Sequence, residues 1–255
     1  MFFGKGEEQH MPNKVQFKDI SGGAAWEIVE NDFRPEENSR WETLFSLGNG
    51  YLGTRGTFEE GLSANTIPTI EGTYVNGFFE SSPIVYGEKA YGFASHTQTM
   101  LNLPNGKLVR IYLSDDDELN LLTGKIIDYR RVLDLRRGML TRTVTWESPQ
   151  GRRVRVIWER LVSMQRKHIM ALQCSITPLN FDGRIMLVSV MDAAVSNLTA
   201  DQNDPRVGSG FGDRGFSLEE ATLDGLTGAF RLHTDNSNMS LACAMTHDLE
   251  IRGGC

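Results

Sequence analysis

The sequence predicts an all-β protein built from antiparallel strands. Short apolar segments separated by turn residues run through most of the 255-residue chain, and no long segment has the 3.6-residue period of an amphipathic helix. Several segments instead alternate apolar and polar side chains, which is typical of strands with one buried face. Together with the 26 glycines, this pattern favours a β-sandwich or barrel with few short helices. No linker rich in Pro, Gly or Ser divides residues 26–255, so we expect one domain there.

The amino-terminal end is expected to contribute an arm and then the first strand. Residues 1–25 are polar and end near Ser21-Gly22-Gly23, which predicts a mobile arm. Residues 26–30 predict the first strand. Residues 31–40 are charged and include Pro35, which indicates a loop or at most one helical turn.

The densest glycine segment of the chain lies within residues 42–56, which we call the glycine segment. Its glycines are too frequent for a helix, where each costs roughly 1 kcal/mol relative to alanine, but they suit positive φ angles and close backbone approach. No Gly-Lys-Ser/Thr ending follows and no helix opens there, which excludes phosphate and dinucleotide loops. Two interpretations stay open. The segment is a tight corner between strands, or a loop that another element or a ligand approaches, with Asn49 and Arg55 as its polar members.

Aromatic side chains give two further candidates for binding. Trp41 is a candidate for stacking on a sugar ring, and also for a place in the core or in an interface. Residues 71–79 predict a strand that runs into a loop. Residues 81–97 hold Tyr86, Tyr91 and Phe93 among small residues. That segment is either a binding loop or a loop pinned by its aromatic rings.

Strand signals become clear from residue 101 onward. Residues 103–108 contain Asn-Gly, the strongest short signal for a hairpin turn, and residues 108–113 predict a strand. The acidic run at residues 115–118 lacks the alternating ligands and the glycine of a calcium loop. We therefore expect a solvated acidic turn there.

The rest of the chain repeats strands and turns. Residues 140–146 alternate large side chains with threonines. After a Ser-Pro-Gln-Gly turn signature, residues 154, 156 and 158 are large and apolar and alternate with residues of the other face, which predicts a hairpin. Residues 185–190 are nearly all apolar and indicate a central strand covered on both faces. Further strands are expected over residues 169–176, 226–232 and 239–245.

The composition excludes several classes of function. A net charge of −7 argues against a general nucleic-acid surface. No apolar run is long enough to cross a bilayer, and the first residues lack the basic start and apolar core of a signal peptide. The three cysteines and five histidines have no metal-ligand spacing. We therefore expect a cytoplasmic protein with free thiols, no metal and no cofactor.

The densest basic cluster consists of Arg130, Arg131, Arg136 and Arg137. Arginine forks match the oxygens of phosphate, so a phosphate contact is one interpretation. The other is that these arginines pair with carboxylates of neighbouring strands, such as Asp128 and Asp134. The sequence marks no carboxyl as an acid with a raised pKa.

Several segments, in this order along the chain, resemble the amino-terminal domain of the maltose, trehalose and kojibiose phosphorylases, which form glycoside hydrolase family 65. They are Trp26-Glu27-Ile28, residues 42–56, Glu71-Gly72-Thr73-Tyr74, Leu101-Asn102-Leu103-Pro104, residues 131–135, Gly138-Met139-Leu140 and residues 160–164. The resemblance covers most of the chain. It implies a large two-sheet antiparallel super-sandwich, similar to galactose mutarotase.

The resemblance also implies that catalysis takes place elsewhere in the parent enzyme. The catalytic glutamate and the phosphate-binding residues of the family lie in a carboxy-terminal (α/α)6 barrel, which this chain lacks, so we assign no catalytic residue. The parent would act on an α-linked disaccharide of the maltose, kojibiose, trehalose or nigerose type with inorganic phosphate, and give β-glucose 1-phosphate with inversion. Hydrolysis, as in the family members that act on trehalose, is the alternative. We expect a homo-oligomer, and no activity from this fragment alone.

The family interpretation gives roles to five residues. Asn49, Tyr51 and Arg55 lie at the interface with the barrel or near the substrate, and Trp41 and Tyr91 are candidates for stacking on the sugar. We expect the face turned to the barrel to be unusually apolar. Two other classes of function stay open: a free-standing carbohydrate-binding sandwich, and a structural domain that makes an interdomain or homodimer contact.

Overall fold

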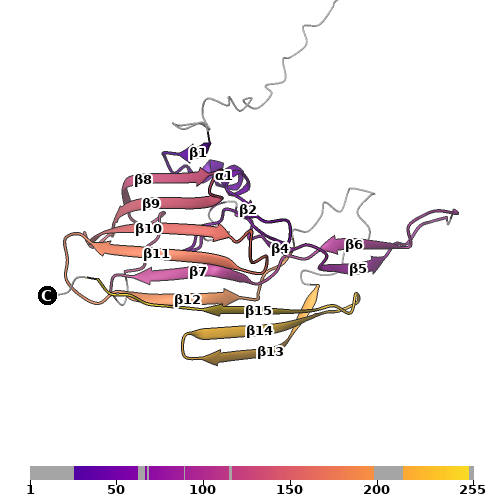
Figure 1. Cartoon of the computed structure of the whole chain (residues 1–255). Coiled ribbons are helices and arrows are strands. Elements are labelled where there is room, and N and C mark those ends of the chain that lie inside the picture. Colours follow the sequence, from indigo (N-terminus) through magenta and orange to yellow (C-terminus); the bar gives the residue numbers. More distant parts are fainter. Residues whose placement is uncertain are drawn as a thin grey trace, which may run out of the picture.

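The computed structural model describes residues 26–62, 67, 69–88, 90–114, 117–197 and 215–252. Residues 1–25, predicted as an arm, lie outside this range. The described chain consists of antiparallel sheets and one short helical segment (Figure 1). The predicted all-β sandwich class is therefore confirmed.

The largest sheet has five antiparallel strands in the order β1-β8-β9-β10-β11. Their bounds are β1 Glu27–Glu30, β8 Lys125–Asp134, β9 Met139–Glu147, β10 Arg153–Val162 and β11 Met170–Pro178. The predicted hairpin is β9–β10, and its turn carries a hydrogen bond from Gly151 N to Ser148 O at 2.9 Å. The even-numbered side chains of β9 and β10 are buried on one face, as the alternation predicts.

A second layer packs against this buried face. β7 (Asn105–Tyr112) and β12 (Met186–Asp192) form an antiparallel pair. Ile111 of β7 and the following Leu113 pack in one core with Val144, Trp146 and Val154 of the main sheet. All five side chains are removed from water, which supplies the hydrophobic stabilisation of this part of the sandwich.

The carboxy-terminal part of the described chain adds a three-stranded sheet. Its strands are β13 (Phe216–Asp224), β14 (Thr227–Thr234) and β15 (Ser240–Thr246). Phe216 and Leu232 pack with Leu101 and Leu103 in a separate core. β14 and β15 confirm the strands predicted over residues 226–232 and 239–245.

Two small sheets lie at one end of the molecule. One holds β2 (Leu47–Gly48), β3 (Leu52–Thr54) and β4 (Thr73–Val75). The other is a hairpin of β5 (Phe79–Pro83) and β6 (His96–Met100), which extends beyond β4 and away from the body (Figure 1). The glycine segment therefore lies at the same end as this hairpin.

The helical segment before the glycine segment is longer than predicted. A 3-10 turn over Pro35–Glu37 leads directly into α1 (Asn38–Leu44). Pro35 stands at the start of the segment, where its missing N–H costs nothing. Trp41 and Phe45 pack on Leu133 and Leu140 of the main sheet. This tertiary contact, which the charged sequence does not reveal, favours helix where we expected a loop.

The hairpin turn predicted at Asn105-Gly106 is wrong. Both residues are extended and begin β7. The Asn105 amide donates to Glu71 Oε2 at 2.7 Å, and its Oδ1 accepts from Lys107 N at 3.0 Å. These contacts hold the asparagine in a strand and override its turn preference.

Two further expectations are also wrong. β12 is not covered on both faces: it lies at the edge of its two-stranded sheet, and Leu187 and Val188 are 41% and 37% exposed. In the acidic run, residues 115 and 116 lie outside the described residues. Asp117 is buried and accepts from Arg152 Nη1 at 3.0 Å, so its carboxylate is not solvated.

The described ranges contain no helix that is long and apolar enough to cross a membrane. Cys174 and Cys243 are half-buried free thiols, as predicted. Burial raises the pKa of Cys243 to about 11 and that of Cys174 further still. Both thiols are therefore protonated at neutral pH and are poor nucleophiles.

Candidate functional site

The glycine segment makes a tight turn between β2 and β3 that is capped by one asparagine. Gly50 has a φ of +85°, a backbone conformation that favours glycine. Asn49 N donates to Leu52 O at 3.1 Å. Asn49 Oδ1 accepts from Tyr51 N at 2.9 Å and from Leu52 N at 2.8 Å. The backbone is therefore the tight strand-to-strand corner of the first interpretation.

The same asparagine ties the turn to the main sheet. Its Nδ2 donates to Ser163 O at 2.6 Å and to Lys167 O at 3.1 Å, both in the connection between β10 and β11. The ring of Tyr51 lies edge-on to His168 with centroids 4.6 Å apart, and Lys167 Nζ lies 4.8 Å from the Tyr51 ring centre. Since both polar atoms of the Asn49 amide are engaged inside the domain, this residue positions the turn.

Arg55 follows β3 and joins the glycine segment to two neighbouring segments. Its Nε donates to Ile70 O at 3.1 Å and its Nη2 to Ser39 O at 3.2 Å. Nη2 also lies 3.6 Å from Glu42 Oε2. The Glu42 carboxylate is buried and accepts from Ile70 N at 3.0 Å. Arg55 thus makes its contacts within the domain, and 18% of its side chain remains exposed.

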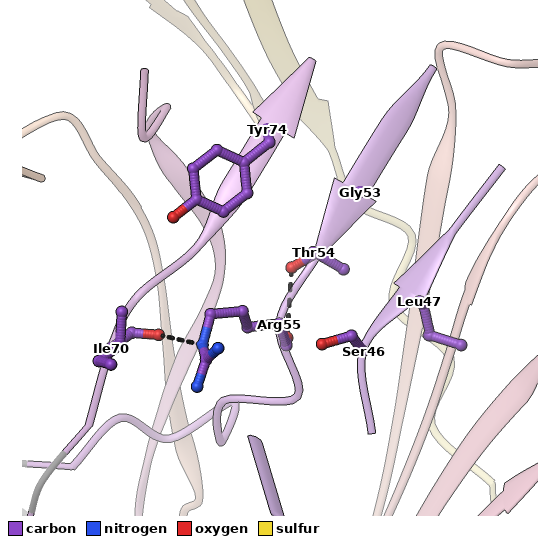
Figure 2. Close-up of a pocket in the computed structure, with 7 residues that line it drawn as sticks. All are labelled: Ser46, Leu47, Gly53, Thr54, Arg55, Ile70 and Tyr74. Atoms are coloured by element: carbon purple, nitrogen blue, oxygen red, sulfur yellow. Dashed lines mark hydrogen bonds between the residues drawn. The ribbon is translucent and has the colours of Figure 1, made fainter. Parts of the chain in front are cut away.

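A shallow recess of about 340 Å³ opens beside Arg55. Its lining residues are Ser46, Leu47, Gly53, Thr54, Arg55, Ile70 and Tyr74. Figure 2 shows the Arg55 side chain between Ile70 on one side and the β2 and β3 strands on the other. The Tyr74 ring lies on the adjoining strand, β4. The lining is mostly apolar and has one guanidinium. Such a surface suits a protein contact that offers an apolar side chain and a hydrogen-bond acceptor.

The interior of the sandwich beneath the glycine segment is charged. Arg131 of β8, Arg142 of β9 and Arg160 of β10 are buried on the inner face of the main sheet. Four carboxylates and one ammonium accompany these three guanidiniums. We call the eight residues the buried charge network: Glu30, Glu59, Glu60, Glu71, Lys107, Arg131, Arg142 and Arg160.

Arg142 and Arg160 hold the two glutamates that follow the glycine segment. Arg142 Nη1 donates to Glu60 Oε1 at 2.7 Å, and its Nη2 donates to Glu59 Oε2 at 2.9 Å and to Glu60 Oε2. Arg160 Nη1 lies 3.5 Å from Glu59 Oε1 and donates to Thr57 O at 3.3 Å. Charge-assisted bonds of this kind are short and directional, so they fix the position of residues 57–60.

Arg131 binds the glycine segment directly. Its Nη2 donates to Gly56 O, and its Nη1 lies 3.8 Å from Glu30 Oε2. Its guanidinium lies over the rings of Phe45 and Phe58, at 4.4 and 4.8 Å from their centres, in cation–π contacts. A Cβ at Gly56 would come within 2.6 Å of the Phe45 Cβ. Glycine therefore permits the close approach that the sequence suggested.

Burial and pairing act against each other on the carboxylates of the network. Burial alone would raise the pKa of Glu59, but Arg160 and Arg142 outweigh it and hold the pKa below its ordinary value. Burial raises the pKa of Glu30, and the nearby Arg131 only partly offsets this rise. The ion pairs of Glu59 are therefore strong enough to keep it charged.

Glu71 and Lys107 form the other end of the network. Lys107 Nζ lies 3.7 Å from Glu71 Oε2 and donates to Thr73 Oγ1 at 3.3 Å. Burial raises the pKa of Glu71 and lowers the pKa of Lys107 to about 8, with each partner opposing the shift of the other. The sequence marked no carboxyl as having a raised pKa. The burial of Glu30 and the partial burial of Glu71, whose side chain is 29% exposed, explain the difference.

The prediction that the arginines of the basic cluster pair with carboxylates of a neighbouring strand is confirmed for Arg130, but the predicted partner Asp134 is wrong. Arg130 Nη2 lies 3.7 Å from Glu27 Oε2 on the neighbouring strand β1. Asp134 accepts instead from the backbone N–H groups of Arg136 and Arg137, at 2.9 and 3.0 Å. Carboxylates on β1 therefore balance the arginines of β8.

The two residues proposed to stack on a sugar have different environments. Trp41 is 6% exposed and stacks on Phe45 with centroids 5.3 Å apart, so its ring belongs to the core and offers no face to a sugar. Tyr91 is fully exposed at the tip of the β5–β6 hairpin. Next to it, Tyr86 and Phe93 pin the tip with ring centroids 5.0 Å apart. Tyr91 thus stays available for a contact, whereas Trp41 does not.

Lys107, Arg142 and Arg160 are buried members of the network that sequence reasoning did not single out. A signal was present for two of them. Arg142 and Arg160 stand at inward positions of alternating strands, each between apolar inward neighbours. A charged residue at such a position needs a buried partner, but the sequence does not say which carboxylate supplies it.

Among the residues that the structure describes, no group of three or more His, Cys, Asp or Glu side chains is arranged to hold a metal ion. The polar side chains described at this end of the molecule make ion pairs and hydrogen bonds. Most of those groups are already engaged within the domain.

The family model for the N-terminal domain of glycosyl hydrolase family 65 matches residues 28–254. An α,α-trehalose phosphorylase from Thermoanaerobacter brockii is 43% identical over 239 residues, which are 94% of this chain and 30% of that protein. A kojibiose phosphorylase from the same organism is 31% identical over 206 residues, which are 78% of this chain and 24% of that protein.

A solved structure agrees with these sequence comparisons. The structure of a putative kojibiose phosphorylase from the human microbiome matches with a TM-score of 0.75 and 28% identity. The match covers 88% of this chain and 28% of that chain. The chain thus spans about 30% of the length of the trehalose phosphorylase that it matches.

Proposed function

The chain belongs to glycosyl hydrolase family 65 as its N-terminal domain, and we propose that it supports the catalytic barrel of an inverting disaccharide phosphorylase. The observation that carries this proposal is the 43% identity to a trehalose phosphorylase over 94% of the chain. The parent enzyme converts an α-linked glucoside and inorganic phosphate into β-glucose 1-phosphate and a free sugar. We also propose that the parent is a cytoplasmic homo-oligomer.

The role of this chain in the reaction is structural: it holds the surface that contacts the barrel in a fixed position. Cleavage of a glycosidic bond needs a carboxylic acid at the leaving oxygen and a nucleophile on the opposite side of the sugar. The carboxyls with raised pKa here, Glu30 and Glu71, are engaged with Arg131, Lys107 and Asn105 inside the domain. We therefore assign the catalytic acid and the phosphate site to the barrel.

We place the contact with the barrel at the face formed by the glycine segment and its recess. The glycine segment is anchored at Gly56 by Arg131 and at its turn by Asn49. The recess beside Arg55 is mostly apolar and open. A surface that is already ordered loses little conformational entropy when another domain docks on it, so this face suits a permanent interdomain contact. In this proposal Asn49, Tyr51 and Arg55 are interface residues.

Trehalose is the first substrate to test, and kojibiose the second. The trehalose phosphorylase is the more similar relative, at 43% identity against 31% for the kojibiose phosphorylase from the same organism. Selectivity for the linkage depends on the barrel. The sequence identity of this domain to its relatives therefore sets the order in which the substrates are tested, but does not decide between them.

The test is an assay of the full-length parent with inorganic phosphate and trehalose, kojibiose, maltose or nigerose. We expect phosphate-dependent release of β-glucose 1-phosphate from one of them, and no release by the 255-residue chain alone. Release of glucose without phosphate would identify a hydrolase instead. No reaction with any of the four sugars would contradict the proposal.

A further inference from the structure

The β5–β6 hairpin ends in an exposed apolar tip that the rest of the described chain does not cover. The tip follows the last ladder contact, from Ile84 N to Ser95 O at 2.9 Å. Val85 is 86% exposed, Tyr91 is fully exposed and Phe93 is 55% exposed. The hairpin projects away from the body of the molecule (Figure 1). Several apolar side chains exposed together on a projecting element mark a contact surface.

The base of the hairpin is held by a buried carboxylate. Glu80 is completely buried, and its two oxygens accept from the backbone N–H groups of Ser81 at 2.6 Å, Asn236 at 2.9 Å and Ser237 at 2.8 Å. Ser237 Oγ also donates to Phe79 O at 2.6 Å. These bonds join the base of the hairpin to the turn between β14 and β15. The hairpin is therefore an arm with an anchored base.

The shape and composition of the tip decide what it fits. A sugar or other small ligand needs a concave site that surrounds most of its surface, whereas this tip projects. Its large exposed apolar side chains, Val85, Tyr91 and Phe93, are aliphatic or aromatic, and the charged Glu88 is exposed beside them. Aromatic side chains on a projecting element are the kind of anchors that fill pockets at the centre of protein interfaces. The partner is therefore a protein surface with an apolar groove.

The position of the arm indicates which protein surface this is. β4, which contributes Tyr74 to the recess, leads through residues 76–78 directly into β5. The arm thus lies at the same end of the domain as β2 and β4, which contribute residues to the recess (Figure 1). The relatives extend well beyond the length of this chain, which spans about 30% of the trehalose phosphorylase. The adjoining surface at this end is then supplied by the remainder of the parent.

We propose that the β5–β6 arm docks its tip, through Val85, Tyr91 and Phe93, into an apolar groove on the catalytic domain of the same polypeptide. This inference rests on the proposed two-domain parent, and it adds a second point of contact beyond the recess. Two contacts from one continuous segment resist rotation of one domain against the other better than one contact does. The arm therefore sets the orientation of the two domains.

The first test is hydroxyl-radical footprinting of the full-length parent and of the 255-residue chain. We expect oxidation of Tyr91 to be several-fold slower in the parent. Oxidation of Trp26, which is half exposed and directly precedes β1, serves as the reference. Equal oxidation of Tyr91 in the two proteins would overturn the proposal. Protection that appears only as the parent concentration is raised would assign the groove to a second copy and would also overturn it.

The second test is the double variant Val85→Ser, Tyr91→Ser. Both side chains are almost fully exposed in this chain, so we expect an unchanged Tm in the 255-residue chain and a lower Tm in the parent. Leu223→Ser, near the end of strand β13, is the matched control because Leu223 is 81% exposed but lies on another hairpin. An unchanged Tm of the parent contradicts docking. Both readouts are independent of sugar turnover, so a failed phosphorylase assay does not affect them.

Discussion

The interior between the two layers has an apolar half and a charged half, and the same strands of the main sheet line both. In the apolar half, Val144 and Trp146 pack on Ile111. In the charged half, Arg142 and Arg160 stand where the alternation would place further apolar residues. Hydrophobic contact is non-directional and roughly proportional to buried area, whereas buried ion pairs require defined partners. The charged half therefore specifies positions that the apolar half does not.

The positions specified by the charged half are those of the glycine segment and the residues after it. Arg131 holds Gly56 O, and Arg142 holds Glu59 and Glu60. Buried ion pairs often contribute little net stability compared with apolar residues of similar size, but breaking one is costly. We infer that the role of this network is to fix the face that we propose as the contact with the barrel.

The largest effect is expected from Arg142→Ala. It removes the partner of two buried carboxylates, so we expect a loss of about 3–5 kcal/mol in the free energy of unfolding, measured by denaturant titration of the 255-residue chain. The loss should shrink as the pH is lowered from 8 to 5, because burial of Glu59 without Arg142 favours its neutral form. Arg155→Ala on the exposed face of β10 is the control and should change stability by less than about 0.5 kcal/mol. Similar losses from both variants would contradict a special role of the network.

Ile111→Ala probes the apolar half, with an expected loss of about 3 kcal/mol from lost burial and a cavity. Ile111 is completely buried and packs in a cluster of apolar residues. Its effect should therefore be the same at pH 5 and pH 8. A strong pH dependence for this variant would show that the two halves are not energetically separate.

A smaller effect is expected from Lys107, and it depends on pH. In the folded state its pKa is about 8, against 10.5 as the ordinary value. Between these values the unfolded chain binds more protons, so stability contributed by this residue rises with pH, by at most about 1.4 kcal/mol per pH unit. Replacement by Met should remove this rise, which unfolding titrations at pH 7.5 and 9.5 would detect. An equal pH response of the wild type and Lys107→Met would be inconsistent with a depressed lysine pKa.

The strands of the apolar half could be predicted from the sequence, because the period of two is a local signal. β9 and β10 show this most directly. The turn preference of Asn105 failed because its amide is bonded to Glu71, which is distant in sequence. α1 was underestimated because Trp41 stabilises it through packing on another element. Local patterns therefore sufficed where burial alone decides the structure.

The candidate site was less predictable for the same physical reason. The sequence identified Asn49 and Arg55 as the polar members of the glycine segment, but their partners are set by the fold. Asn49 binds Ser163, 114 residues further along the chain, and Arg55 binds backbone oxygens of Ser39 and Ile70. Long-range hydrogen bonds leave no periodic pattern, so only the structure assigns these residues to positioning.

The most direct test of the central claim, that the glycine segment is a positioned interface and not a substrate contact, uses Asn49→Ala and Arg55→Ala in the full-length parent. Tm and kcat/KM are measured together, the latter well below Tm. Because each side chain makes several hydrogen bonds inside the domain, we expect a lower Tm and a loss of about 1–2 kcal/mol in the free energy of unfolding. We expect kcat/KM to stay close to that of the wild type. A fall in kcat/KM at unchanged Tm would place the segment at the substrate and contradict the claim.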